Sequence, residues 1–399
     1  MNDIYTAFLT IAVLVFVAEV LSSALHRFKA PDLVGQIIAG MIVGPYAIGG
    51  LINQLLGYDL IVVNQEVVFV AEFSVLLLIF ASGLEHGLGS LRSAGILGML
   101  GATFGALSPF LSAYLVYTPI YGQDTALIMG AALGATSLAA VVHLLKGLDR
   151  LAVNFLLSAA AFDDVVALII LSVVMTYVLG GVGGPGDLAF KVVELLGLWI
   201  VILLVSAIVV PRLADWLGES YVYKFSLVVL FGLTVLMVSL GYSPIIAAFV
   251  AGVALAGSYS KKKIEEITSV LLNVFGPVFF AYIGAEVNLT SVDLHVVLLA
   301  LELTALATVF KILGILPFAL LKFKDLKKSF VTSIGMVPRG ETGLVIAYVG
   351  STIGVLGKTE FEAVVLMALF TTLLGAYMFK VTSVILQQRE NEQQPDLRP

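Results

Sequence analysis

A chain of 399 residues that is 60% hydrophobic and only 12% charged is too apolar for a soluble domain, in which about 25% of residues are charged. Its net charge of −6 says little about partners, because the position of charge matters more than its sum in a membrane protein. The lack of cysteine excludes disulfides and thiolate metal sites, and four scattered histidines disfavour a metalloenzyme. The composition therefore indicates a protein that crosses the bilayer many times.

Apolar runs bounded by turn residues or charges predict thirteen membrane spans, so the expected fold class is an all-α polytopic membrane protein. The ninth span is short, and its separation from the eighth depends on the turn sequence GYSP at 241–244. The spans are expected at 4–25, 31–50, 66–84, 94–117, 124–145, 152–179, 188–210, 221–240, 243–257, 269–287, 293–321, 328–349 and 360–386.

The basic residues predict the orientation of these spans. When loops are assigned alternately to the two sides, seventeen of the 21 basic residues lie on one side and only Lys191 and Lys358 on the other. Lysine and arginine collect in cytoplasmic loops. We therefore expect a plasma or inner membrane protein with its N-terminus outside and its C-terminus in the cytoplasm.

Thirteen spans divide into six, one linker and six, and the two halves then have opposite orientations. Inverted repeats of this kind are typical of secondary transporters, whose ion sites lie where membrane helices are interrupted. The fifth span of the first half reads GAALGATSLAAVV (130–142), and the fifth span of the second half reads SIGMVPRGETGLVIA (333–347). Their glycines, hydroxyl residues and proline predict two helices that unwind near the middle of the membrane.

Two adjacent carboxylates follow the first break, in the run AAAFDDVVALII at 159–170. One ionised aspartate at the bilayer centre costs about 3 kcal/mol on insertion scales, so Asp163 and Asp164 predict a functional ion site. Neighbouring residues on a helix point about 100° apart, and the two carboxylates should therefore face different partners. Structural polar contacts between helices are the alternative interpretation.

Two cations inside predicted spans, Lys311 and Arg339, are expected to compensate the buried acids. Snorkelling to the membrane surface is the alternative for Lys311, although its central position argues against it. For Arg339, mutual neutralisation with Glu341, two residues further on, is the favoured structural role.

The segments AAAFDDVVALIIL, GATS, FKILG and GMVPRGETGLVIA together resemble the monovalent cation:proton antiporter superfamily, in its paired-aspartate branch of NapA- and NhaA-type sodium/proton antiporters. The resemblance covers essentially the whole chain. It implies the NhaA-like fold, with two inverted repeats and two crossed, unwound helices.

The resemblance also implies roles for single residues. Asp164 would bind the monovalent Na⁺ or the proton, with Asp163 as its partner, paired with Lys311 when the cation is absent. Thr136 and Ser137 would line the crossing of the unwound helices. Arg339 and Glu341 would compensate charge there.

The implied activity is antiport of Na⁺ or Li⁺ against H⁺ by alternating access, electrogenic if Lys311 also releases a proton. Residues 66–179 and 269–386 would form a mobile core, and 1–65 and 188–257 a dimerisation domain. The expected partners are Na⁺, Li⁺, H⁺, the lipid bilayer and a second copy of the chain, with no nucleic acid, no cofactor and no enzymatic reaction. A potassium/proton antiporter is the nearest alternative, and a cation channel or an intramembrane aspartyl protease fits the motifs less well.

Overall fold

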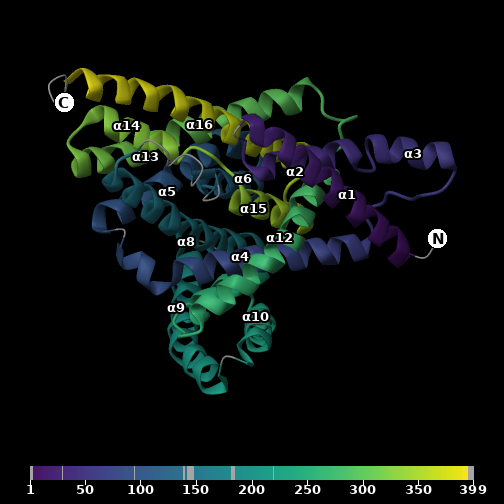
Figure 1. The fold of residues 1–399 in the computed structure, drawn as a ribbon, viewed down its shortest axis with the longest axis horizontal. Coiled ribbons are helices and arrows are strands. Elements are labelled where there is room, and N and C mark those ends of the chain that lie inside the picture. The colour runs from purple at the N-terminus through teal and green to yellow at the C-terminus, as the bar shows by residue number, and fades with distance from the viewer. Residues whose placement is uncertain are drawn as a thin grey trace, which may run out of the picture. The chain divides into compact units, whose positions relative to one another are not determined.

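The computed structural model describes residues 3–28, 30–93, 95–137, 140–141, 148–180, 185–218 and 220–393, and these residues are helical without strands (Figure 1). The helices in the first half are α1 (Asp3–Leu25), α2 (Asp32–Val43), α3 (Ile48–Leu56), α4 (Gln65–Ser93), α5 (Gly95–Tyr121), α6 (Gln123–Gly134) and α8 (Arg150–Gly180). Those in the second half are α9 (Pro185–Leu217), α10 (Val222–Ser239), α11 (Pro244–Leu255), α12 (Lys261–Glu286), α13 (Leu294–Phe323), α14 (Leu326–Gly335), α15 (Glu341–Thr352) and α16 (Lys358–Gln393). The predicted all-α class is confirmed.

In the described part of the chain, ten helices are long and apolar enough to cross a membrane. Each matches one of the predicted spans. The ninth predicted span is the shorter apolar helix α11, and the fifth and twelfth fall on interrupted helices. Because interrupted helices do not reach spanning length, the total of thirteen stays a prediction.

Helix ends follow the local chemistry of the sequence. Pro244 begins α11, where its missing N–H costs nothing, and the side chain of Ser243 accepts a hydrogen bond from the Ile245 N–H at 3.4 Å. Asp293 caps α13 through the Val296 N–H at 3.0 Å. The turn predicted from GYSP is therefore present and separates α10 from α11.

Close packing divides the chain into two compact units. The first unit comprises residues 1–21, 36–92 and 168–287, and the second comprises residues 22–35, 93–167 and 288–399.

In the first unit, a Cβ atom on Gly40 would clash with the Ala281 carbonyl, so α2 and α12 need glycine to approach this closely. On α9, Val201, Leu204, Val205 and Ile208 are exposed at helical spacing, as expected of a surface that meets lipid.

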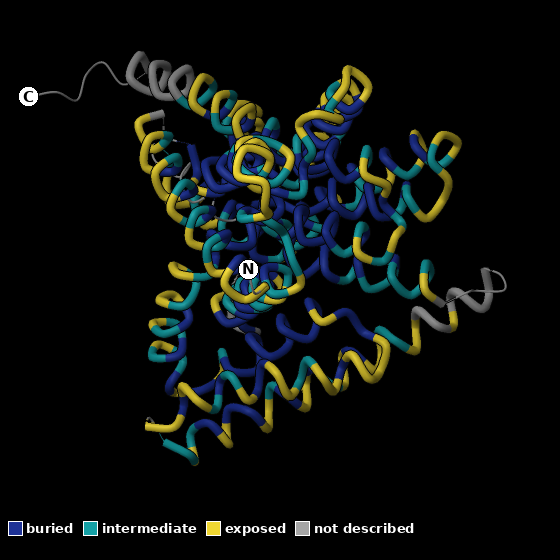
Figure 2. The backbone as a smooth tube through the Cα atoms, turned by 90° about the vertical axis from the view of Figure 1, so that its right-hand side faces the viewer, coloured by how far each residue is buried: buried dark blue, intermediate teal, exposed yellow. Residues whose placement is uncertain are grey.

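The second unit contains α5, α6 and α13 to α16, which are grouped together in Figure 1, and the first part of α8. Helix α5 packs on both α6 and α13, and α15 packs on α6 and α16. Along many helices buried positions alternate with exposed ones, while α6 and α15 carry mostly buried residues (Figure 2). The two short helices therefore lie within the packed interior of this unit.

Candidate ion site

Two helix interruptions meet inside the second unit. Helix α6 ends at Gly134 and the chain runs extended through Ala135, while the other break occupies residues 336–340 between α14 and α15. The Ser137 N–H donates to the Pro338 carbonyl at 2.9 Å, which joins one break directly to the other. Both predicted interruptions are therefore present, and each satisfies backbone groups that the other leaves free.

Helix α8 presents the two aspartates next to these breaks. Asp163 and Asp164 are 0% and 3% exposed. The fully buried Lys311 ammonium on α13 donates to Asp163 Oδ1 at 2.6 Å and to the Gly134 carbonyl, at the end of α6, at 2.8 Å. Lys311 therefore does not snorkel. It holds a buried ion pair and satisfies an orphan carbonyl of the broken helix.

Asp164 faces a different helix from Asp163, as the 100° step between neighbouring helical positions requires. Its Oδ1 atom accepts a hydrogen bond from the hydroxyl of Thr342, in the first turn of α15, at 3.0 Å. Thr342 is 2% exposed and was not singled out from the sequence, because one threonine in an apolar run is unremarkable there. The only available signal was its position directly after Glu341, inside the motif of the second break.

Arg339 is fully buried in the second break. Its guanidinium donates to the Ala307 carbonyl at 2.9 Å, to the Met336 carbonyl at 3.3 Å and to the Thr136 hydroxyl at 3.4 Å. The favoured expectation that Arg339 takes Glu341 as its partner is wrong. Carbonyl oxygens freed by the interruption, together with one on α13, occupy the guanidinium instead.

Glu341 connects the second break to the first. Its Oε2 atom accepts a hydrogen bond from the Ser137 hydroxyl at 2.7 Å, and the Ser137 oxygen in turn accepts one from the Ala140 N–H at 3.2 Å. The carboxylate lies at the N-terminus of α15, where the helix dipole favours negative charge. All the predicted site residues are thus gathered around one crossing.

The cytoplasm-facing end predicted for α8 carries a further ion pair. Asp149 Oδ1 accepts a hydrogen bond from the Ala152 N–H at 2.8 Å and so caps α8, while its other carboxylate oxygen pairs with Lys328 on α14. Partial burial raises the pKa of Asp149, but the hydrogen bonds from Lys328 and the backbone outweigh it, and the pKa is lowered overall. The pair joins the helix of the aspartates to one half of the second interrupted helix.

Replacing Asp149 should separate capping from ion pairing. We expect Asp149→Ala to lower stability by about 1 kcal/mol, because the cap is lost, and Asp149→Asn to cost less, because asparagine still caps and exposed ion pairs contribute about 0–1 kcal/mol. Since the folded pKa is lowered, the ion pair stabilises at neutral pH and is lost as the pH falls through that lowered pKa. Thermal unfolding of both variants in detergent checks this, and equal melting temperatures for the two variants would contradict it.

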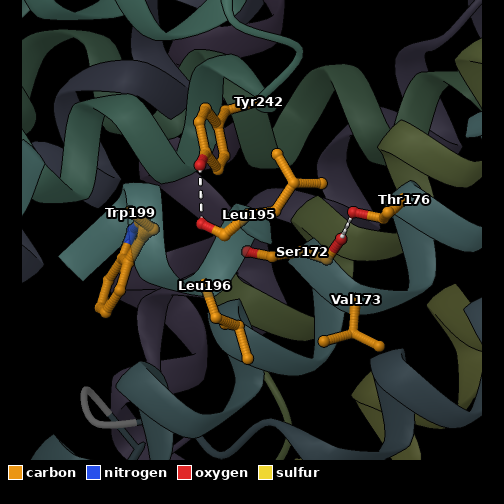
Figure 3. Close-up of a pocket in the computed structure, with 7 residues that line it drawn as sticks. All are labelled: Ser172, Val173, Thr176, Leu195, Leu196, Trp199 and Tyr242. Carbon is orange, nitrogen blue, oxygen red and sulfur yellow. Dashed lines mark hydrogen bonds between the residues drawn. The ribbon is translucent and has the colours of Figure 1, made fainter. Parts of the chain in front are cut away.

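A cavity in the first unit has a different character (Figure 3). Its volume is about 10 Å³, roughly the space of one water molecule, and it is lined by Ser172, Val173, Thr176, Leu195, Leu196, Trp199 and Tyr242. The Tyr242 hydroxyl, at its edge, donates to the Leu195 carbonyl at 2.7 Å. Its lining contains no carboxylate, in contrast to the crossing of the interrupted helices beside Asp163 and Asp164.

Comparison with known proteins agrees with this architecture. Residues 11–383 match the transmembrane sodium/hydrogen exchanger family. The probable Na⁺/H⁺ antiporter GerT of Bacillus cereus is 30% identical over 352 residues, which cover 85% of this chain and 89% of GerT. The Na⁺/H⁺-K⁺ antiporter GerN of the same organism is 28% identical over 387 residues, covering 94% and 96%. The chain belongs to the sodium/hydrogen exchanger family, as its motifs predicted.

A solved structure shows the same fold. The sodium proton antiporter MjNhaP1 from Methanocaldococcus jannaschii superposes with a TM-score of 0.73, covering 95% of this chain and 98% of that chain, at 15% sequence identity. At this low identity the likeness concerns the fold alone. The chain is therefore a multi-pass membrane protein with an antiporter fold, in which α8 and α13 bring Asp163, Asp164 and Lys311 to the crossing of the interrupted helices.

Proposed function

We propose that this protein is a secondary-active antiporter that exchanges Na⁺ or Li⁺ for H⁺ by alternating access. The observation that carries the proposal is the buried Asp163–Lys311 ion pair beside Asp164, at the crossing of two interrupted helices. Intramembrane ionisable groups in such a position mark ion and proton pathways. The relatives named as Na⁺/H⁺ antiporters support the same activity.

Competition for one carboxylate is sufficient to couple the two ions. Asp164 binds either a proton or a cation, and the hydroxyls and free carbonyls of the crossing supply the neutral oxygen ligands that a hard cation prefers. Coupling then requires only that the empty, charged site does not cross the membrane, because a buried unpaired charge is costly.

Lys311 makes the exchange electrogenic in this proposal. When Na⁺ takes the oxygen of Asp163, the ammonium loses its partner in an apolar setting, which favours its neutral form. One proton then leaves from Lys311 and another from Asp164 for each Na⁺ bound. The cycle therefore moves net charge.

Potassium is the second candidate substrate, because the relative GerN is named a Na⁺/H⁺-K⁺ antiporter. The test is a pH-sensitive dye in proteoliposomes with an acidic interior, to which Na⁺, Li⁺ or K⁺ is added separately. We expect Na⁺ and Li⁺ to drive protons out. A response to K⁺ alone would favour the potassium/proton antiporter, and cation flux without proton movement would favour a channel.

The proposal extends to the arrangement of the protein in the cell membrane. We assign residues 66–179 and 269–386 to a mobile core, since every candidate ion-site residue falls within them, and residues 1–65 and 188–257 to the scaffold of a homodimer. Cross-linking in native membranes, read as a dimer on a denaturing gel, tests the homodimer.

The bias of basic residues predicts an external N-terminus and a cytoplasmic C-terminus in the plasma or inner membrane. A fluorescent protein fused after Pro399 should therefore fluoresce in bacterial cells, since it folds in the cytoplasm. A periplasmic phosphatase fused at the same point should be inactive. A dark fluorescent fusion with an active phosphatase fusion would overturn the orientation and the span count.

A further inference from the structure

The hydroxyl of Thr342 donates to a carboxylate on another helix, whereas several buried threonines of the second unit bond to their own helix. The hydroxyls of Thr304, Thr332 and Thr371 each donate to the carbonyl four residues earlier in their own helix, the usual habit of a helical threonine. Thr342 instead donates to the carboxylate of Asp164 on α8.

The second break explains this difference. Thr342 stands in the first turn of α15, so the residues three and four positions before it, Arg339 and Pro338, belong to the break and not to the helix. The Pro338 carbonyl already accepts the Ser137 N–H at 2.9 Å, and the Arg339 carbonyl accepts the Thr372 hydroxyl at 2.5 Å. Each of these carbonyls already has one donor, and the hydroxyl of Thr342 donates to the carboxylate of Asp164 instead.

We propose that Thr342 is a ligand of the transported cation, an inference that rests on the proposed function. Na⁺ has nearly the radius of Ca²⁺, which takes oxygen ligands at about 2.4 Å. The Thr342 hydroxyl oxygen and Asp164 Oδ1 lie 3.0 Å apart. One ion can therefore contact both oxygens at a ligand distance of about 2.4 Å. A hydroxyl is both donor and acceptor, and it can therefore exchange its hydrogen bond to the carboxylate for a bond to the cation.

Once its hydrogen bond to Asp164 is broken, the hydroxyl of Thr342 has other acceptors nearby. A backbone carbonyl carries two lone pairs, so the oxygens of Pro338 and Arg339 can each take a second hydrogen bond. The hydroxyl of Thr342 then has an acceptor for its hydrogen while the cation is bound. When Asp164 is protonated, the hydroxyl and the carboxylic acid still bond to each other, and the proton-loaded state needs no ligand from Thr342. The side chain thus distinguishes the cation-loaded state from the proton-loaded state.

Three substitutions test this role. Thr342→Val and Thr342→Ala remove the hydroxyl, Thr342→Ser retains it, and Thr371→Val is the matched control, since its hydroxyl bonds only to its own helix. In both hydroxyl-free variants the cation loses one oxygen ligand, and the KM for Na⁺ should therefore rise about tenfold or more. The maximal rate should change less than about twofold. The serine variant and the control should match the wild type. The alanine variant serves the test if valine does not fold.

The pH dependence separates a ligand from a residue that only orients Asp164. Asp164 interacts with Lys311 on α13, which pairs with the neighbouring Asp163, while Arg339 and Glu341 lie at the second break just before Thr342. If Thr342 merely stabilised the ionised carboxylate, its loss would matter only where protons compete with Na⁺ for Asp164, and the defect would fade at alkaline pH. A missing ligand weakens Na⁺ binding there as well, and we expect the raised KM to persist.

Two results would overturn the inference while leaving the proposed function standing: a wild-type KM in the valine and alanine variants, or a defect that disappears at alkaline pH. An equal defect in the serine variant would also overturn it, because packing rather than the hydroxyl would then be responsible. An inactive wild-type protein would refute the proposed function itself.

Discussion

Asp164→Asn should abolish Na⁺-driven proton movement while the protein remains folded. Asparagine keeps the size of the side chain and can still accept the hydrogen bond that Thr342 donates at 3.0 Å. It cannot bind and release a proton, and a neutral amide holds a cation poorly. Since both halves of the exchange use this carboxylate, the expected loss is complete. The measurement is dye dequenching in proteoliposomes after addition of Na⁺.

Asp124→Asn is the matched control for this variant. Asp124 lies exposed in the first turn of α6, in the same unit, and its loss should leave exchange at the wild-type level. Size-exclusion profiles and melting temperatures establish that both variants are folded. Exchange near the wild-type rate in a folded Asp164→Asn variant would remove Asp164 from the ion site.

Lys311→Gln should disconnect transport from the membrane potential. If the wild type moves one net charge per cycle, 100 mV contributes about 2.3 kcal/mol, which displaces the final Na⁺ gradient about 50-fold. Without the ammonium only Asp164 releases a proton, and the exchange becomes one for one. The end point should then be independent of the imposed potential, while the affinity for Na⁺ changes less. Potassium and valinomycin set the potential in the liposomes.

Lys322→Gln, in the exposed last turn of α13, is the corresponding control and should keep the voltage response. Stability provides an independent check, because Lys311→Gln leaves the fully buried Asp163 without its partner, at a cost of about 3–5 kcal/mol. Adding Asp163→Asn should restore much of the lost melting temperature. A voltage response that survives in the folded Lys311→Gln variant would refute the two-proton mechanism.

The sequence predicted those parts of the site whose cause is local. Pro338 and the glycines around it predicted the second break, and the cost of burying two acids singled out Asp163 and Asp164. The sequence also predicted Lys311 as a cation that compensates the buried acids, but its pairing with Asp163 in particular, 148 residues away, was expected only from the family resemblance.

Contacts formed where the two interrupted helices cross could not be predicted from the sequence. Nearness in sequence suggested Glu341 as the partner of Arg339, but the guanidinium bonds to carbonyls, one of them Ala307 on a helix far away in sequence. The contact of Thr342 with Asp164 was missed for the same reason. Like the engagement of the local carbonyls by Ser137 and Thr372, it is revealed only by the folded structure. The number of spans was uncertain because an interrupted helix loses the length that identifies a span.

The ratio of protons to Na⁺ is the decisive measurement, because it reports on Asp164 and Lys311 together. In proteoliposomes with valinomycin and equal potassium on both sides, the potential is zero, and an imposed pH difference can be adjusted until a Na⁺ gradient drives no net proton flux. If two protons exchange for each Na⁺, a tenfold Na⁺ gradient, worth about 1.4 kcal/mol, should be balanced by about half a pH unit. Balance at one full unit would mean electroneutral exchange that leaves Lys311 protonated throughout. The absence of any balancing pH difference would mean that the two ions are not coupled.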